Sequence, residues 1–77
     1  MLSAYVLIET EVGKVAHVAK ALTTLDGVQL AEDLAGPYDV IANVHAPSLD
    51  ELGRLVVSQI QVLDGVTRTV TCIVLHR

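Results

Sequence analysis

The chain has 77 residues, of which 52% are hydrophobic and 18% are charged. This length suits one small domain that spans residues 1–77. Small domains bury little surface, so they usually gain stability from disulfides, a metal or oligomerisation. Cys72 is the only cysteine, which excludes an internal disulfide and a zinc site built on cysteine pairs. Oligomerisation is therefore the expected source of added stability.

The charge argues against contact with nucleic acids. Nine acidic and five basic residues give a formal net charge of −4, and the basic residues are scattered along the chain. Tyr5 and Tyr38 are the only aromatic residues, too few for a sheet that stacks bases. No apolar run approaches the roughly 20 residues of a membrane span, and no charged leader precedes the first apolar run. We expect a soluble, cytoplasmic protein that binds neither nucleic acid nor membrane directly.

The first half of the chain predicts a strand, a helix and a second strand. Residues 4–9 form a short apolar run typical of a strand. Apolar residues then recur at helical spacing over residues 15–25, and Thr10 is expected to cap this helix. Gly27 is expected to end the helix, and residues 28–33 form the next strand.

The second half repeats this order. Residues 39–45 form an apolar strand, and Ser48 with Glu51 makes a capping box that starts a helix. Residues 67–75 are rich in β-branched side chains and predict the last strand. The sequence Leu-Asp-Gly-Val follows both predicted helices, at residues 25–28 and again at residues 63–66. The predicted fold is α+β and ferredoxin-like, β-α-β-β-α-β, with two helices on one face of a four-stranded antiparallel sheet.

The first and last predicted strands are apolar on both faces. Val6 and Leu7 point to opposite sides of the first strand, and Val70 and Ile73 do so in the last. Helices cover only one face, and each Leu or Val side chain left in water forgoes about 1.5–3 kcal/mol. We expect the second face to pack against another copy, which gives a sheet-to-sheet homodimer. Cys72 is expected to be a small buried apolar residue rather than a nucleophile.

The sequence contains few candidates for catalytic or metal-binding residues. His17, His45 and His76 have no ligand spacing and fall on different predicted elements, so no metal site is predicted. No combination of residues suggests a nucleophilic triad, and no glycine-rich loop suggests a phosphate site. We predict no catalytic residue, no cofactor and no enzymatic activity.

The segment between the second and third strands has a more specific composition. Gly36 permits a turn conformation, Pro37 stiffens the turn, and Tyr38 and Asp39 place polar groups at the head of a buried strand. Composition alone favours an ordinary turn, in which Asp39 makes local hydrogen bonds with the backbone.

Two motifs in this order resemble the regulatory half of the Lrp/AsnC (feast/famine) transcription regulators. One is Gly-Pro-Tyr-Asp-Val at residues 36–40, which matches the family's Gly-x-Tyr-Asp loop. The other is Leu-Asp-Gly-Val-Thr-Arg-Thr-Val-Thr at residues 63–71, which matches its Leu-(Pro or Asp)-Gly-Val-x-x-Thr-x-Thr run. The resemblance covers essentially all 77 residues. The 77 residues do not include the helix-turn-helix that normally precedes this domain, so we expect the chain to resemble a stand-alone RAM domain (regulation of amino-acid metabolism).

The resemblance implies an effector-binding and oligomerisation module linked to transcriptional regulation of amino-acid metabolism. It implies sheet-to-sheet dimers that form rings, often octamers, and a free amino acid bound between neighbouring dimers. The matching site positions are Gly36, Tyr38 and Asp39, with Thr67 and Thr69 as additions. Amides near Gly36 would bind the ligand carboxylate, Asp39 would accept from its ammonium, and Tyr38 would add apolar contact and a hydroxyl. A full-length regulator of the family is a further partner that the missing segment suggests.

Fold alone leaves three other classes open. A small dimeric α+β-barrel enzyme such as a monooxygenase would need a polar cavity, for which this chain has few candidates and neither Trp nor Phe. A soft-metal-binding domain would need Cys-x-x-Cys in the first loop, where residues 9–13 read Glu-Thr-Glu-Val-Gly. An assembly module without a ligand is the third alternative.

Overall fold

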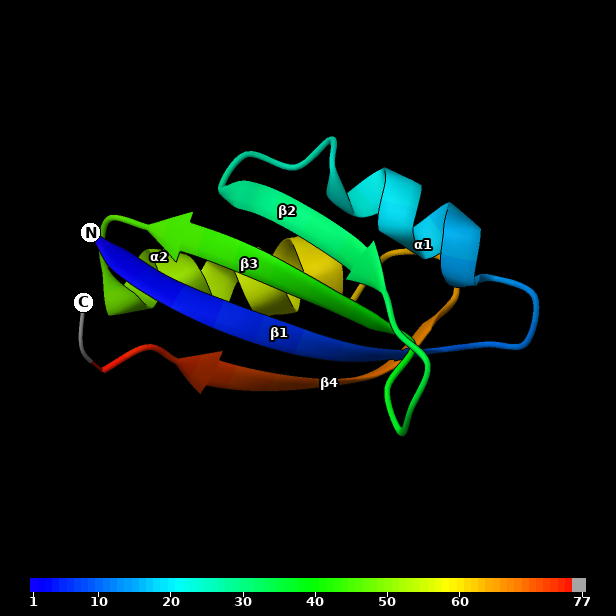
Figure 1. Ribbon diagram of the computed structural model, residues 1–77. Coiled ribbons are helices and arrows are strands. Elements are labelled where there is room, and N and C mark those ends of the chain that lie inside the picture. Colours follow the sequence, from blue (N-terminus) through cyan, green and yellow to red (C-terminus); the bar gives the residue numbers. More distant parts are fainter. Residues whose placement is uncertain (76–77) are drawn as a thin grey trace.

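The structure, a computed structural model, describes residues 1–75, so His76 lies outside the described residues. Its elements are, in chain order, β1 (Leu2–Thr10), α1 (Val15–Leu22), β2 (Val28–Asp33), β3 (Val40–Ala46), α2 (Leu49–Arg54), the π-helical continuation η1 (Leu55–Ile60) and β4 (Val66–Ile73). The strands form one antiparallel sheet in the order β2-β3-β1-β4 (Figure 1). The predicted ferredoxin-like β-α-β-β-α-β fold is confirmed.

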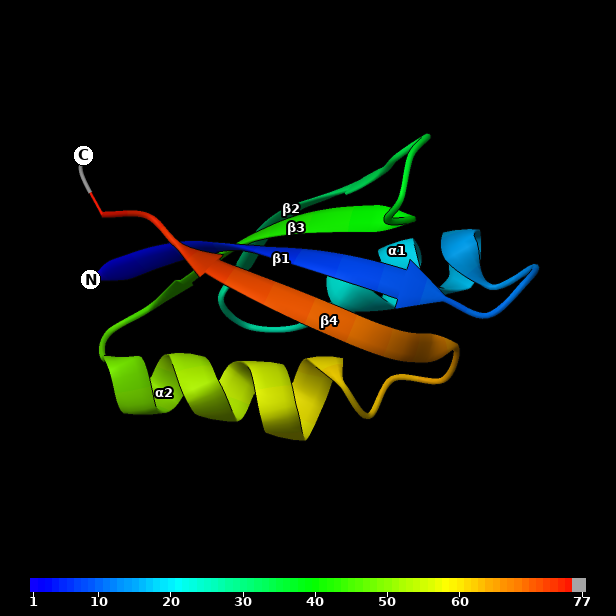
Figure 2. The same cartoon turned by 90° about the horizontal axis from the view of Figure 1, so that it is seen from below.

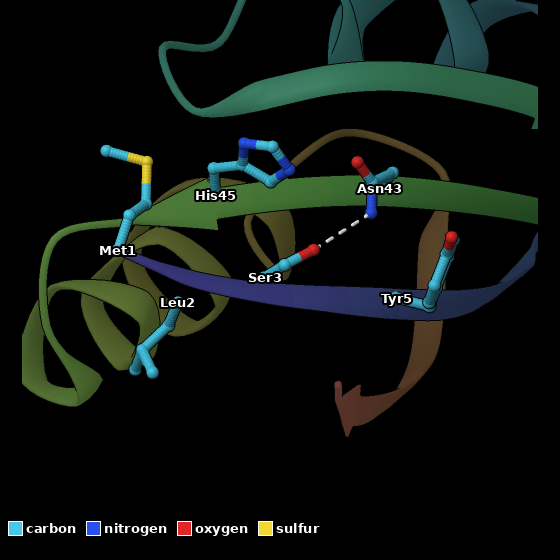
Figure 3. A pocket seen from close by; sticks show the side chains of 6 residues that line it. All are labelled: Met1, Leu2, Ser3, Tyr5, Asn43 and His45. Atoms are coloured by element: carbon cyan, nitrogen blue, oxygen red, sulfur yellow. Dashed lines mark hydrogen bonds between the residues drawn. The ribbon is translucent and has the colours of Figure 1, made fainter. Parts of the chain in front are cut away.

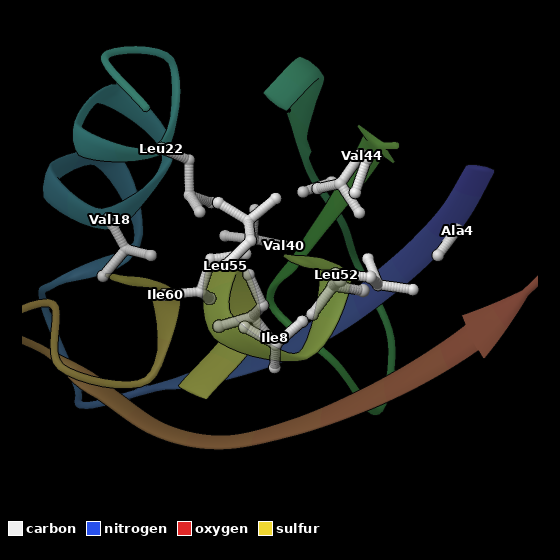
Figure 4. Close-up of a cluster of buried hydrophobic side chains, with 13 residues drawn as sticks. Ala4, Ile8, Val18, Leu22, Val40, Val44, Leu52, Leu55 and Ile60 are labelled. Atoms are coloured by element: carbon white, nitrogen blue, oxygen red, sulfur yellow. The ribbon is translucent and has the colours of Figure 1, made fainter. Parts of the chain in front are cut away.

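The core lies between the sheet and the two helices. Alternation along β1 buries Ala4, Val6 and Ile8 completely, and Val18 of α1 and Ile60 of η1 pack into the same cluster (Figure 4). Full burial of each Val, Leu or Ile side chain contributes roughly 1.5–3 kcal/mol, which makes this layer the main source of stability.

The face of the sheet away from the helices, here called the open face, is uncovered in the single chain (Figure 2). Because residues directly opposite in a sheet share a face, the strand register assigns its members. They are Ser3, Tyr5, Leu7, Glu9, Leu30, Glu32, Ile41, Asn43, His45, Arg68, Val70 and Cys72. The prediction that Cys72 is buried is wrong for the single chain, because Cys72 lies on this face and is exposed.

The predicted cap of the first helix is also wrong. β1 continues through Thr10, and the chain then turns at Gly13, whose φ of 82° is left-handed, before α1 begins at Val15. Lys14 occupies the N-cap position of α1 and makes no side-chain capping bond. Thr10 is unavailable to a helix because its N–H and hydroxyl both donate to Asp39.

The end of α1 comes earlier than Gly27. The hydroxyls of Thr23 and Thr24 donate to the carbonyls of Lys20 and Ala21, both at 2.7 Å. Hydroxyls that bond the preceding turn compete with helix propagation, and the helix stops at Leu22. The predicted start of α2 is confirmed, because Glu51 N–H donates to the Ser48 hydroxyl at 3.2 Å.

The repeated Leu-Asp-Gly-Val sequence is a repeated turn. Gly27 and Gly65 have φ values of 94° and 98°, in the left-handed region that favours glycine. The carbonyl of each then accepts a hydrogen bond of 2.7 Å from a distant segment, Gly27 from His45 and Gly65 from Glu11. Each turn therefore starts an edge strand and joins it to the other half of the chain.

Candidate functional site

Asp39, at the head of β3, is bonded to the end of β1. Its Oδ2 accepts from the backbone N–H of Thr10 at 2.8 Å and from the Thr10 hydroxyl at 3.3 Å. Its own N–H donates to the carbonyl of Ile8 at 2.9 Å, and its carbonyl accepts from Leu34 at 2.8 Å. The expectation of a purely local turn is therefore wrong, because the Asp39 carboxylate joins residues 29 positions apart in the chain.

The loop before Asp39 projects from the sheet. In Figure 2 it rises on the side opposite α2, above the open face. Gly36 lies in a bend of this loop, is exposed, and is not among the described glycines with positive φ. A Cβ added at Gly36 would meet no atom within 4 Å. Tyr38 is half-buried where the loop rejoins the sheet.

Thr67 and Thr69 lie at the start of β4. The Thr67 hydroxyl donates to the carbonyl of Glu9 at 3.2 Å, and the Thr69 hydroxyl accepts from Gln61 at 2.9 Å. With Gln61, Val66 and Arg68 they line a hollow of about 390 Å³.

The five predicted positions thus lie at one end of the sheet but not in one hollow. Asp39 bonds Thr10 and Thr67 bonds Glu9, so the end of β1 lies between the heads of β3 and β4. Two strand spacings of about 4.8 Å separate those heads by roughly 10 Å. Within one chain, a small ligand held by Asp39 would not reach Thr67.

Charged side chains surround the same end of the sheet. Arg68 approaches Glu9 at 3.7 Å, and Lys14 bonds Asp64 at 3.0 Å, with His17 at 3.8 Å from Asp64. The hydrogen bond and positive charge of Lys14 lower the pKa of Asp64 below its ordinary value of 3.8. These pairs are solvent-exposed, so each adds little to stability.

A second hollow, which the sequence analysis missed, lies on the open face. It has a volume of about 510 Å³ and is lined by Met1, Leu2, Ser3, Tyr5, Asn43 and His45 (Figure 3). Tyr5 lies directly opposite Asn43, whose side-chain amide donates to the Ser3 hydroxyl at 3.4 Å. These side chains offer neutral hydrogen-bonding groups and one imidazole. In the sequence, the only sign of this hollow is that polar residues occupy alternate positions in two predicted strands. They come together only because β1 pairs with β3.

Within residues 1–75, no group of three His, Cys, Asp or Glu side chains is placed to hold a metal ion. His17 lies on α1 and is exposed to solvent, and His45 lies on β3. No helix in this part of the chain is both long and apolar enough to cross a membrane.

Residues 3–77 match the model of the Lrp/AsnC ligand binding domain family. Over 57 residues the chain is 32% identical to an uncharacterized HTH-type transcriptional regulator of Pyrococcus abyssi, PYRAB16920. That alignment covers 74% of this chain and 38% of the regulator, so the chain matches well under half of the relative's length.

Two solved structures have nearly the same fold. TTHA0845 of Thermus thermophilus superposes with a TM-score of 0.94 and 32% identity, covering 100% of this chain and 96% of that one. AsnC of E. coli superposes with a TM-score of 0.92 and 26% identity, covering 99% of this chain and 52% of AsnC. Both helices of residues 1–75 lie between strands, so this part of the chain contains no helix-turn-helix.

Proposed function

Because the chain belongs to the Lrp/AsnC ligand-binding domain family, we propose that it binds a free amino acid at the loop from Gly36 to Asp39. The family consists of ligand-binding domains of transcriptional regulators and not of enzymes. The chain is therefore a regulatory effector-binding domain. The amino acid, the residues that hold it and the assembly it controls are our proposal.

The exposed backbone at Gly36 carries the proposal. Neither a left-handed φ nor a close neighbour within the chain explains a glycine there. Glycine would instead let an external group approach the amides of the loop. A carboxylate suits such amides, because charged acceptors make the stronger hydrogen bonds with N–H groups.

Asp39 supplies the complementary charge. Both hydrogen bonds from Thr10 end on Oδ2, and among the described residues no donor bonds Oδ1. Oδ1 would accept from the ammonium group of the ligand, while Oδ2 fixes the carboxylate in position. Tyr38, half-buried beside Asp39, would contact the ligand's aliphatic part.

The threonines of β4 would act from a neighbouring copy. Thr67 and Thr69 lie across β1 from Asp39, too far to share a small ligand with it in one chain. A ligand between two dimers would contact the loop of one copy and the threonine hollow of the next. Binding would then strengthen the higher oligomer, a ring of dimers such as an octamer.

The dimer itself would form through the open face. Leu7 lies directly opposite both Ile41 and Val70, which makes an apolar belt across three strands. Leu30 on β2 is 54% exposed beside it. A second copy of the sheet is the cover that suits a self-complementary face of this kind.

A structure of the same fold has been solved with an amino acid. The regulator NMB0573 of Neisseria meningitidis, 17% identical with a TM-score of 0.86, was crystallised as a complex with L-Met. The chain covers 50% of that regulator. This likeness supports a free amino acid as the ligand class of the present chain.

A melting-temperature screen against the twenty amino acids tests the proposal. A ligand at 100 times its dissociation constant stabilises the folded state by about 2.7 kcal/mol. We expect one amino acid, or a small chemically related group, to raise the melting temperature in this way. If none of the twenty does so, the alternative of an assembly module without a ligand replaces the proposal.

A further inference from the structure

The two edges of the sheet differ in how they are protected. β2 has a register shift between Val28 and Leu30, and it ends in Glu32 and Asp33. Bulges and charges are the usual means by which proteins prevent an edge strand from pairing with another chain. The β2 edge has both.

The β4 edge lacks this protection over most of its length. Its register shift and its single charge, Arg68, lie at its start, and residues 69–73 read Thr-Val-Thr-Cys-Ile. Val74 N–H donates to the carbonyl of Ser3 at 2.9 Å, towards β1. Because alternate residues of an antiparallel strand face the same neighbour, Thr69, Thr71 and Ile73 point their N–H and C=O groups outward. This stretch is an uncharged, β-branched edge.

An apolar groove runs beside this edge, where β4 and the second helix lie next to each other (Figure 2). It has a volume of about 280 Å³, and none of the described residues that line it is charged. Leu49 and Val57 on its helical wall are 61% and 59% exposed, and Ile73 on its strand wall is 41% exposed. The second helix therefore leaves the helix-side face of β4 partly uncovered.

We propose that β4 pairs antiparallel with β4 of a second copy, so that the two sheets become one and the two grooves close over each other. An antiparallel pair of identical strands is self-complementary in its hydrogen bonds, as a two-fold interface requires. Two chains of net charge −4 repel one another, so contact between copies is favoured at a surface without charged residues. The groove beside β4 is such a surface. Leu49 and Val57 of each copy would lie above the joined strands. Pairing here uses a different surface from the open face, so both contacts can form in one assembly.

A matched pair of lysine substitutions tests the groove. Val57→Lys places a charge on the helical wall, while Val62→Lys makes the same change at a valine that is 69% exposed and outside the groove. By light scattering after gel filtration, Val57→Lys should halve the mass of the assembly and Val62→Lys should leave it unchanged. Unchanged mass for Val57→Lys would overturn the proposal. A groove that binds a peptide of another protein would give this same unchanged mass.

Cysteine cross-linking tests the strand pairing without a change of charge. Native Cys72 is tested first; in a Cys72→Ser background, Thr69→Cys, Val70→Cys, Thr71→Cys and Ile73→Cys then scan the rest of the edge, and Gln29→Cys on β2 is the control. A residue opposite its own copy lies about 4.5–5.5 Å away between Cα atoms, within disulfide range. We expect one of these five β4 positions to cross-link under mild oxidation. Absence of any such dimer, or equal cross-linking at Gln29→Cys, would overturn the pairing.

The outcome is separable from that of the proposed function. Leu7→Asp disrupts the open face, whose contacts lie on the other side of the sheet from the groove. The β4 cross-link should persist in Leu7→Asp, in a particle of lower mass. A β4 cross-link in a protein that binds no amino acid would support the interface and reject only the ligand.

Discussion

Asp39 and Thr10 are joined by a hydrogen bond of 2.8 Å from the backbone N–H of Thr10 to the carboxylate, between residues 29 positions apart. The Thr10 hydroxyl adds a second bond of 3.3 Å to the same oxygen. Asp39 therefore stabilises the fold before any ligand arrives. Its proposed role in binding uses the other oxygen.

Asp39→Ala and Asp39→Asn should consequently differ in their free energy of unfolding. Alanine removes a charged hydrogen-bond acceptor, which we expect to lower the free energy of unfolding by about 1.5–3 kcal/mol in urea titrations. Asparagine keeps an oxygen for Thr10 but removes the charge that would bind an ammonium group. We expect it to cost under about 1 kcal/mol and to abolish the response to amino acids. Wild-type amino-acid affinity in Asp39→Asn would remove Asp39 from the ligand site.

Gly36→Ala should separate ligand binding from stability. No neighbour lies within 4 Å of the added Cβ and φ is not left-handed, so the apo protein should be unchanged or stabilised by up to about 1 kcal/mol. The methyl group would obstruct the loop amides, and ligand affinity should fall at least tenfold. Gly53→Ala, also free of neighbours, is the control that should retain full ligand response. Equal affinity in both variants would contradict the role of the loop backbone.

The glycines of the two repeated turns should be far less tolerant. A Cβ at Gly27 would lie 2.8 Å from the carbonyl oxygen of His45, and one at Gly65 would lie 2.7 Å from Cβ of Lys14. Each also has a left-handed φ, which costs an L-residue about 1–2 kcal/mol before any clash. We expect Gly27→Ala and Gly65→Ala to lose more than about 2 kcal/mol in chemical unfolding. Gly13→Ala, left-handed but free of neighbours, should lose only the backbone cost. Equal losses at all three positions would show that the close contacts are unimportant.

Val70→Asp tests the open face. Val70 lies directly opposite Leu7, so an aspartate there would place a charge within the apolar belt. Burial of an unpaired charge is costly, and the sheet-to-sheet dimer should dissociate while circular dichroism keeps the spectrum of the folded chain. Val62→Asp, at an exposed turn, is the control. A particle of undiminished mass in Val70→Asp would mean that another surface forms the dimer.

The fold could be predicted because its signals are local. The short apolar run of β1, the helical spacing in α1 and the Ser48 cap each act within a few residues, and the same order of elements precedes both copies of the repeated turn. The wrong predictions concern residues whose local structure depends on a contact with a residue far along the chain. Thr10 can cap a helix or end a strand, and Asp39, far along the chain, decides which.

The arrangement of the candidate site residues could be predicted only in part, for the same reason. The loop motif predicted Asp39 at the head of a strand, where it lies, but its bond to Thr10 depends on how β1 pairs with β3. The hollow formed by Tyr5, Asn43 and His45 depends on that register as well, and a slip of one residue would move these side chains to the other face. Cys72 lies on the open face and is exposed in the single chain, so only the proposed second copy would bury it.

The central claim is that an amino acid binds at the loop from Gly36 to Asp39. Backbone amide spectra of the isotope-labelled protein, titrated with the amino acid that raises the melting temperature most, test this location most directly. We predict saturable shifts that are largest at Gly36, Tyr38 and Asp39, with further shifts at Thr67 and Thr69. Shifts centred on Ser3, Tyr5, Asn43 and His45 would place the ligand on the open face and contradict the claim, as would a spectrum that none of the twenty amino acids alters.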